Sequence, residues 1–279
     1  MGVIDLRQSL RALVALSTSL ITCHSNAEQA LRLTNGVDES AGGAPALIIT
    51  TPSATYYLET EGGGLSSMLD PDGIDWLGFH NEEGSGHKGE YRGFPNAVHR
   101  QDGNYFHAMN AGTDPSTSVV EIESDEHIRI VTTSDNEKWQ AQWDFYPDRC
   151  DFTMRSISPG YKYWIQYEGV PGGEMDSTDY WYASDHSERQ PIESARIGDL
   201  PHPEWMAFGD SDSPRVLYVL KHEDDQHPDD YVSRPDMTVL GFGRRDKDKY
   251  LTTAHTVSIG FLESTDFDAI DQFVKSLID

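Results

Sequence analysis

Short runs rich in β-branched and aromatic residues, separated by tight turns, follow one another along most of the chain. Turn sequences such as GGG at 62–64 and DPDG at 70–73 punctuate these runs. Closely spaced strands joined by tight turns predict antiparallel pairing and exclude alternating strand–helix units. The predicted strands cover residues 46–51, 55–60, 64–69, 118–123, 127–133, 138–146, 150–157, 161–167, 204–208, 215–222, 237–242 and 256–262.

The segment 138–146 has a strict period of two. Trp139, Trp143 and the apolar residues between and after them share one side, whereas Gln140 and Gln142 fall on the other. Successive side chains of a strand point to opposite faces of its sheet. This segment therefore predicts a strand with one face in a core and the other in water or a groove.

One helix is indicated, at the C-terminus. Thr265 can cap it, acidic residues fall in its first turn, and Phe267, Ile270, Val274 and Leu277 form one apolar stripe. The stripe predicts that the helix packs against the outside of a sheet. The expected fold class is all-β, a large antiparallel β-sandwich with a single C-terminal helix.

The first 27 residues have the layout of a secretory signal peptide. Arg7 and Arg11 precede an apolar run over 12–21, and small residues lead to a cleavage site after Ala27. We therefore expect 1–27 to be removed on export.

The rest of the chain divides into a polar lead-in over 28–45, expected to be flexible, and the β-sandwich over 46–279. The expected location is secreted or periplasmic, and a lipid anchor at Cys23 is the weaker alternative. No second long apolar run follows, so the mature chain is expected to have no transmembrane segment.

The charge balance restricts the classes of partner. The chain carries 47 acidic against 21 basic side chains, a formal net charge of −26. Such a surface disfavours nucleic acid and anionic membranes as partners. It favours a protein that stays soluble in salt.

The sequence TYYLETEGGGLSSMLDPDG at 55–73 combines a strand, a glycine-rich turn, a second strand and an Asp-Pro-Asp-Gly turn. This pattern resembles the opening hairpins of galactose mutarotase-like β-supersandwich proteins, a fold found in aldose epimerases, accessory domains of glycosidases and several polysaccharide lyases. The resemblance in pattern and size covers about 46–263. It implies a supersandwich that acts on carbohydrate, but the family's catalytic His and Glu have no motif match here, so epimerase activity does not carry over.

The segment 87–107, HKGEYRGFPNAVHRQDGNYFH, is a cationic island in this acidic chain. It contains one lysine and two arginines but only two carboxylates, and its three histidines could add positive charge. Such an island is a candidate site for an anionic substrate, and a surface loop that balances acidic neighbours is the alternative interpretation. The candidate catalytic residues in it are Tyr91, Arg92, Asn96, His99, Tyr105 and His107.

A second cluster favours a sugar site. In 161–168, YKYWIQYE, alternation predicts one face of Lys162, Trp164, Gln166 and Glu168. A flat aromatic ring between hydrogen-bonding groups suits a pyranose. Trp181 and His186, which follow a glycine loop, complete the candidate substrate-binding set, and ordinary core packing is the alternative for the aromatic residues.

The chemistry these groups could perform is β-elimination on a uronate polymer. Removal of the C5 proton requires neutralisation of the neighbouring carboxylate, a base, and an acid for the leaving oxygen. We expect Arg92 with Asn96 to neutralise the carboxylate, His99 or Tyr105 to be the base, and Tyr91 or Tyr167 to be the acid. The expected partner is thus an acidic polysaccharide or oligosaccharide.

Three alternatives remain open from the sequence: a glycoside hydrolase, an epimerase of the same fold, and a binding domain without catalysis. Hydrolysis would need paired carboxylates, which Glu168, Glu174 and Asp176 could supply. No cofactor and no metal site are assigned. The acidic loop 222–230, HEDDQHPDD, could hold Ca²⁺, although a solvated acidic loop is favoured.

Cleavage after Ala27 is directly testable. The charged start, the apolar run and the small residues predict that the exported protein begins at Glu28. N-terminal sequencing of secreted material checks this, and a product that begins at Met1 would reject it.

Overall fold

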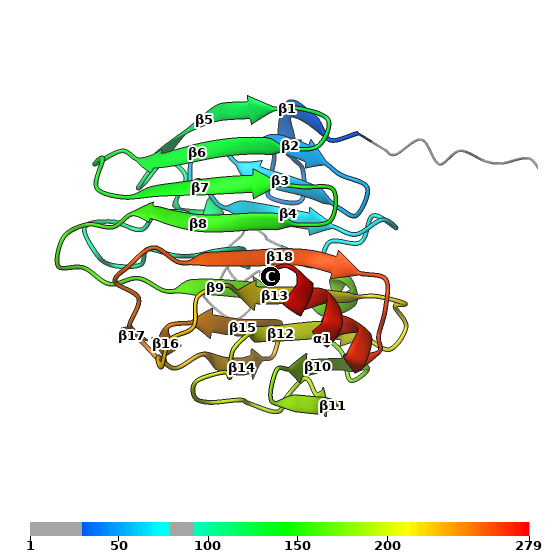
Figure 1. Ribbon diagram of the computed structural model, residues 1–279. Helices are drawn as coiled ribbons and strands as arrows, with labels where there is room; N and C mark the ends of the chain where they lie inside the picture. Colours follow the sequence, from blue (N-terminus) through cyan, green and yellow to red (C-terminus); the bar gives the residue numbers. More distant parts are fainter. Residues whose placement is uncertain (1–29, 79–91, 279) are drawn as a thin grey trace, which may run out of the picture.

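The computed structural model describes residues 30–78 and 92–278; the expected signal peptide and Tyr91 lie outside them. A nine-stranded antiparallel sheet has the order β11-β10-β12-β13-β18-β8-β7-β6-β5 and forms the front layer in Figure 1. Its strands are β5 (Ser116–Glu123), β6 (Ile128–Ser134), β7 (Gln140–Phe145), β8 (Cys150–Ser156), β10 (Asp179–Ala183), β11 (His186–Pro191), β12 (Glu204–Asp210), β13 (Val216–Lys221) and β18 (Thr256–Leu262).

Two smaller antiparallel sheets form the second layer, one behind each half of the large sheet (Figure 1). The expected all-β sandwich is therefore confirmed. The first contains β1 (Arg32–Asp38), β2 (Ala44–Thr50), β3 (Thr55–Glu59) and β4 (Leu65–Leu69). The second has the order β14 (Asp230–Arg234), β15 (Met237–Phe242) and β9 (Ile165–Gly169). The remaining elements are short. They are the hairpin of β16 (Arg244–Arg245) and β17 (Asp248–Lys249) and the 3₁₀ turns η1 (Ala108–Asn110) and η2 (Pro171–Gly173).

The core lies between the layers. Tyr56 of β3 meets Phe145 of β7 with ring centroids 5.2 Å apart, and Tyr167 of β9 meets Phe208 of β12 at the same distance. Trp143 and its same-face neighbours on β7 belong to this core, which confirms the period-two prediction. Edge-on and tilted aromatic pairs of this kind fill the space between sheets and fix their separation.

In the segment 28–45, the described residues 30–45 are not a flexible lead-in, because they contain β1 and the start of β2. Thr34 pairs with Ile48 in an antiparallel register that runs the whole length of β1. Asp38 at its end is buried and accepts hydrogen bonds from Ser66 Oγ at 2.6 Å and Ser67 Oγ at 2.7 Å. An edge strand can be polar because only one side of its backbone is paired, which is why composition concealed it.

The predicted C-terminal helix is present as α1 (Phe267–Ser276). Its cap is Asp266 rather than Thr265: the carboxylate accepts from the Ala269 backbone N–H at 3.0 Å. Ile270 and Val274 are fully buried against the outer face of β12 and β13, where Figure 1 shows the helix in front of the large sheet. Across the described residues, no helix has the length and apolar character to cross a bilayer.

We predict that Ile270→Ala lowers the free energy of unfolding by about 2–5 kcal/mol, because it leaves a cavity under α1. Gln272→Ala, on the exposed side of the same helix, should change it by less than about 0.5 kcal/mol. Urea denaturation measures both. Equal small effects would mean that α1 adds nothing to the stability of the large sheet.

Candidate functional site

A cavity of about 360 Å³ opens on the side of β9 and β15 that faces away from the core. Four segments far apart in sequence line it: the loop before β5, the start of β9, the end of β14, and the β16–β17 hairpin. We call it the cationic pocket; its residues are Asn96, His99, Arg100, Met109, Trp164, Gln166, Glu168, Arg234, Arg244, Asp246, Lys247 and Lys249.

Strand β9 links the two segments that the sequence singled out. The Gln166 N–H donates to Pro95 O at 2.7 Å, and the Glu168 N–H donates to Gly93 O at 3.0 Å. Segment 93–97 thus continues the sheet beside β9. As alternation predicts, Gln166 and Glu168 line the pocket while Tyr167 lies in the core.

The pocket is strongly positive in an acidic chain. Its lining has five cationic side chains and only two carboxylates, an excess of three formal charges. Arg244 and Lys249 come from the β16–β17 hairpin, whose first strand is anchored by the buried Asp229: one carboxylate oxygen accepts from the Gly243 N–H at 3.0 Å. An excess of positive charge in a concave site attracts and retains anions.

Glu168 is buried at the base of this pocket. Burial raises the pKa of its carboxyl to about 7, and Arg244 and a hydrogen bond from Asn96 only partly oppose that rise. Near neutral pH the carboxyl is therefore partly protonated and can give or take a proton.

His99 shows the opposite shift. Burial, followed by Lys249, Arg100 and Arg244, lowers its pKa below the usual value. The imidazole is accordingly neutral at pH 7 and can accept a proton. A neutral base and a partly protonated acid thus share one cationic pocket.

Gln166 is oriented by its neighbour. Its Nε2 donates to Glu168 Oε1 at 3.0 Å, while its own Oε1 is buried and meets no donor among the described residues. A buried amide oxygen without a donor costs about 1–3 kcal/mol.

Trp164 does not provide an open platform for a sugar. It is 5% exposed, and its ring contacts Lys249 Nζ at 4.3 Å and the Arg244 guanidinium at 5.4 Å. The His99 ring stacks on it at 6.0 Å with 17° between the planes. The stacking role expected from the sequence is corrected, because cations and an imidazole already occupy the ring.

The predicted catalytic residues Arg92, Tyr105, His107 and Tyr167 lie outside the cationic pocket. Arg92 lines another cavity with Glu174 and donates to Gly78 O at 2.9 Å. Each of the other three is held by a structural hydrogen bond. Tyr105 donates to Asp135 at 2.6 Å, Tyr167 donates to Trp76 O at 2.9 Å, and His107 Nδ1 accepts from the Met109 N–H at 3.0 Å.

Three predicted substrate-binding residues are also elsewhere. Trp181 of β10 is a core residue whose indole N–H donates to Ser194 O at 3.0 Å. His186 pairs with Asp185 at 2.7 Å, and Lys162 lines a separate cavity near Tyr250. Composition alone could not separate these residues from Gln166 and Glu168, because exposure to the pocket depends on which sheet each segment joins.

The sequence reading missed the pocket cations of the hairpin and of β14. The signal was available: GRRDKDK at 243–249 holds four cations in seven residues of a chain with a net charge of −26. The local net charge of this segment stands out when it is compared with the net charge of the whole chain. Its position beside β9 could not be found that way, because the two segments are distant in sequence.

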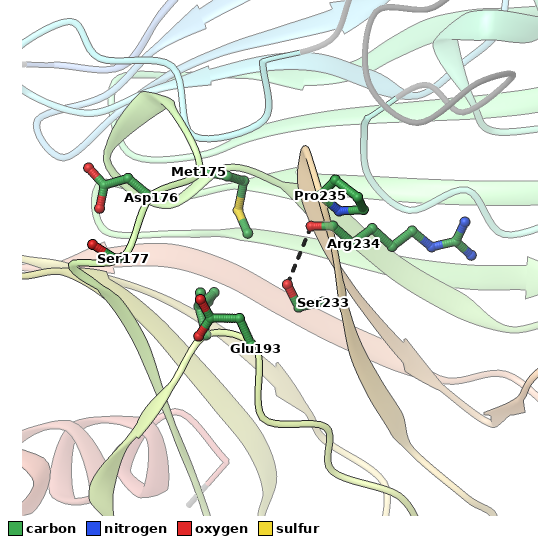
Figure 2. Close-up of a pocket in the computed structure, with 8 residues that line it drawn as sticks. Met175, Asp176, Ser177, Glu193, Ser233, Arg234 and Pro235 are labelled. Atoms are coloured by element: carbon green, nitrogen blue, oxygen red, sulfur yellow. Dashed lines mark hydrogen bonds between the residues drawn. The ribbon is translucent and has the colours of Figure 1, made fainter.

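A neighbouring cavity of about 460 Å³, drawn in Figure 2, has a different character. Asp176 and Glu193 are among the residues that line it. Figure 2 shows Arg234 extending away from both carboxylates, and this arginine also lines the cationic pocket. The acidic lining disfavours an anionic sugar here, and of the carboxylates considered for hydrolysis only Asp176 reaches this cavity.

The acidic loop 222–230 contributes Asp229 to the one group of potential metal ligands found among the described residues, together with Asp199 and Glu204. An ammonium group already lies there: Lys221 Nζ is 2.5 Å from Glu204 and 2.8 Å from Asp225. This internal cation balances carboxylates that a Ca²⁺ ion would otherwise balance. Ca²⁺ binding by the loop stays a prediction.

Glu168→Gln should change how stability depends on pH. The carboxyl pKa is about 7 in the fold against an ordinary 4.5, so its contribution is fully present below the ordinary value and lost as the pH rises through about 7. Glutamine stays neutral, so the variant should gain about 3 kcal/mol over wild type between about pH 4 and about pH 8. Urea unfolding at both pH values measures this gain, with the exposed Glu188→Gln as control. Parallel curves for wild type and Glu168→Gln would contradict the assignment.

No protein-family model matches the sequence, and no curated protein matches it either. Solved structures do match. HI1317 aligns with a TM-score of 0.54 and 12% identity over 83% of this chain and 99% of its own. A galactose mutarotase related enzyme from Lactobacillus acidophilus aligns with a TM-score of 0.48 and 9% identity over 84% of this chain and 99% of its own. The chain therefore shares the fold of HI1317.

Proposed function

We propose that this chain is a carbohydrate-active enzyme that binds an anionic sugar in the cationic pocket and transfers protons on it, with β-elimination on a uronate as the reaction. One observation carries the proposal: the buried Glu168, with a pKa of about 7, lines the same positively charged cavity as the neutral His99. The sandwich fold and the predicted export agree with an enzyme that meets polysaccharide outside the cytoplasm.

The elimination would proceed with each group in one role. Arg244 and Lys249 neutralise the substrate carboxylate, which makes the adjacent C5 proton acidic. His99 takes that proton, and the electron pair left on C5 forms the C4–C5 double bond. The C4–O4 bond breaks, and the protonated Glu168 gives its proton to O4 of the leaving sugar.

This assignment keeps the chemistry expected from the sequence and changes two of its residues. Arg244 replaces Arg92 as the neutralising cation, because only Arg244 lines the pocket that holds His99. Glu168 replaces a tyrosine as the acid, since Tyr167 donates to Trp76 O and Tyr91 lies outside the described residues. Asn96, which the sequence analysis paired with the arginine, instead supports Glu168 through a hydrogen bond.

Mutarotation of a single anionic sugar is the second candidate. Its supporting observation is the volume of about 360 Å³, near the lower end of the roughly 300–1,000 Å³ of small-molecule sites. The same acid and base would then exchange protons with the ring oxygen and the anomeric hydroxyl.

Ultraviolet absorbance during incubation with a panel of uronate polymers tests the proposal. Elimination leaves a conjugated double bond that absorbs at roughly 230 nm, whereas mutarotation leaves none and appears instead as anomer exchange by NMR. Glu168→Gln and His99→Ala should each lower kcat by about 10²–10⁴-fold, and Arg244→Ala by about 10²–10³-fold. The rate should fall below the lowered pKa of His99 and again above about pH 7, as Glu168 ionises.

Arg155→Ala, which changes an exposed arginine of β8 outside the pocket lining, is the matched control and should leave the rate unchanged. Arg92→Ala decides between the two arginine assignments. Loss of activity in Arg92→Ala with full activity in Arg244→Ala would return the site to the cavity near Glu174.

A further inference from the structure

We propose that Trp164 is a positioning residue. Its ring brings Arg244, Lys249 and His99 together in one anion-binding site for the charged group of the ligand. The inference rests on the proposed function only for the identity of that ligand as a sugar. It assigns the indole an electrostatic role in place of contact with a sugar ring.

The indole is rigidly held. Its Nε1–H donates to Asn96 O at 2.7 Å, and the side chain is 5% exposed. This hydrogen bond ties the ring to the segment that also carries His99. The ring plane is therefore fixed before any ligand enters.

Two cations rest on this fixed ring. Lys249 Nζ lies 4.3 Å and the Arg244 guanidinium 5.4 Å from its centroid, within the roughly 6 Å over which an aromatic face attracts a cation. Among the ion pairs between described residues, none involves Arg244 or Lys249; Arg244 instead donates through Nε to the Asp246 carbonyl at 3.0 Å. The negative face of the ring thus offsets the repulsion between two like charges without neutralising them. Arg244 also interacts with Glu168, whose carboxyl is partly protonated near neutral pH.

The same ring places the base beside the cations. His99 stacks on it at 6.0 Å, nearly parallel, and Lys249, Arg100 and Arg244 all act on the imidazole. In elimination the proton to be removed sits on the carbon that bears the carboxylate. The base must therefore lie next to the cations that bind the carboxylate, and Trp164 holds the two together.

A series of fluorinated tryptophans at position 164 tests this role, because each fluorine withdraws electron density from the face of the ring while hardly altering its size. The probe is inorganic sulfate, measured by titration calorimetry on the full chain. Affinity should fall steadily with each added fluorine, by roughly 3- to 30-fold across the series. The same series at Trp143, a fully buried core residue, should have no effect.

A second readout needs no ligand. Burial, followed by the neighbouring cations, lowers the His99 pKa. Trp164→Leu disperses the cations and uncovers the imidazole, so it should raise this pKa, and Trp164→Phe should retain most of the wild-type value; NMR titration measures this. If sulfate affinity does not change across the fluorinated series, the inference is overturned even if Trp164→Leu weakens binding, since the ring would then act only by its size. Wild type that binds no sulfate overturns it as well. If sulfate affinity falls with each fluorine but the protein turns over no uronate, the anion-binding site is retained and the proposed function is rejected instead.

Discussion

The pairing of β9 on both of its edges is the constraint on which the rest of the site depends. β15 bonds to one edge, with Gln166 opposite Gly241, and segment 93–97 bonds to the other. A strand held on both sides cannot slip by one residue without moving its core side chains into the pocket. Tyr167 in the core and Glu168 in the pocket are thereby fixed by a single register.

The part of the site predictable from sequence is the part that local periodicity determines. Alternation through 161–168 correctly separated Gln166 and Glu168 from Tyr167, because a strand has two faces whatever its partners are. The placement of Asn96 and His99 beside them agreed with the charge of their segment. The overall sandwich followed from strand length and turn spacing in the same way.

What failed depended on contacts between distant segments. Arg92 has the right charge, but its side chain donates to Gly78 O and lines the separate cavity that Glu174 also lines. Trp181 is an aromatic residue near a glycine loop, but β10 places it in the core. Arg244 was overlooked because its hairpin reaches the pocket only through the buried Asp229 and the bond from the Arg244 N–H to Pro228 O at 2.8 Å. None of these outcomes is encoded in a window of neighbouring residues.

The electrostatics of the pocket couple ligand charge to the protonation of both proton-transfer groups. Burial favours the protonated form of Glu168, which Arg244 partly opposes, and burial together with the surrounding cations favours neutral His99. An anionic group bound to those cations would cancel part of their field. The pKa of Glu168 would then rise, which keeps the acid protonated, and the pKa of His99 would also rise, which makes the imidazole a stronger base. A neutral sugar would produce neither change. Under the proposed function, the positive charge of the pocket would therefore do more than hold the ligand: an anionic ligand would move both pKa values upward from the values that burial and the cations set.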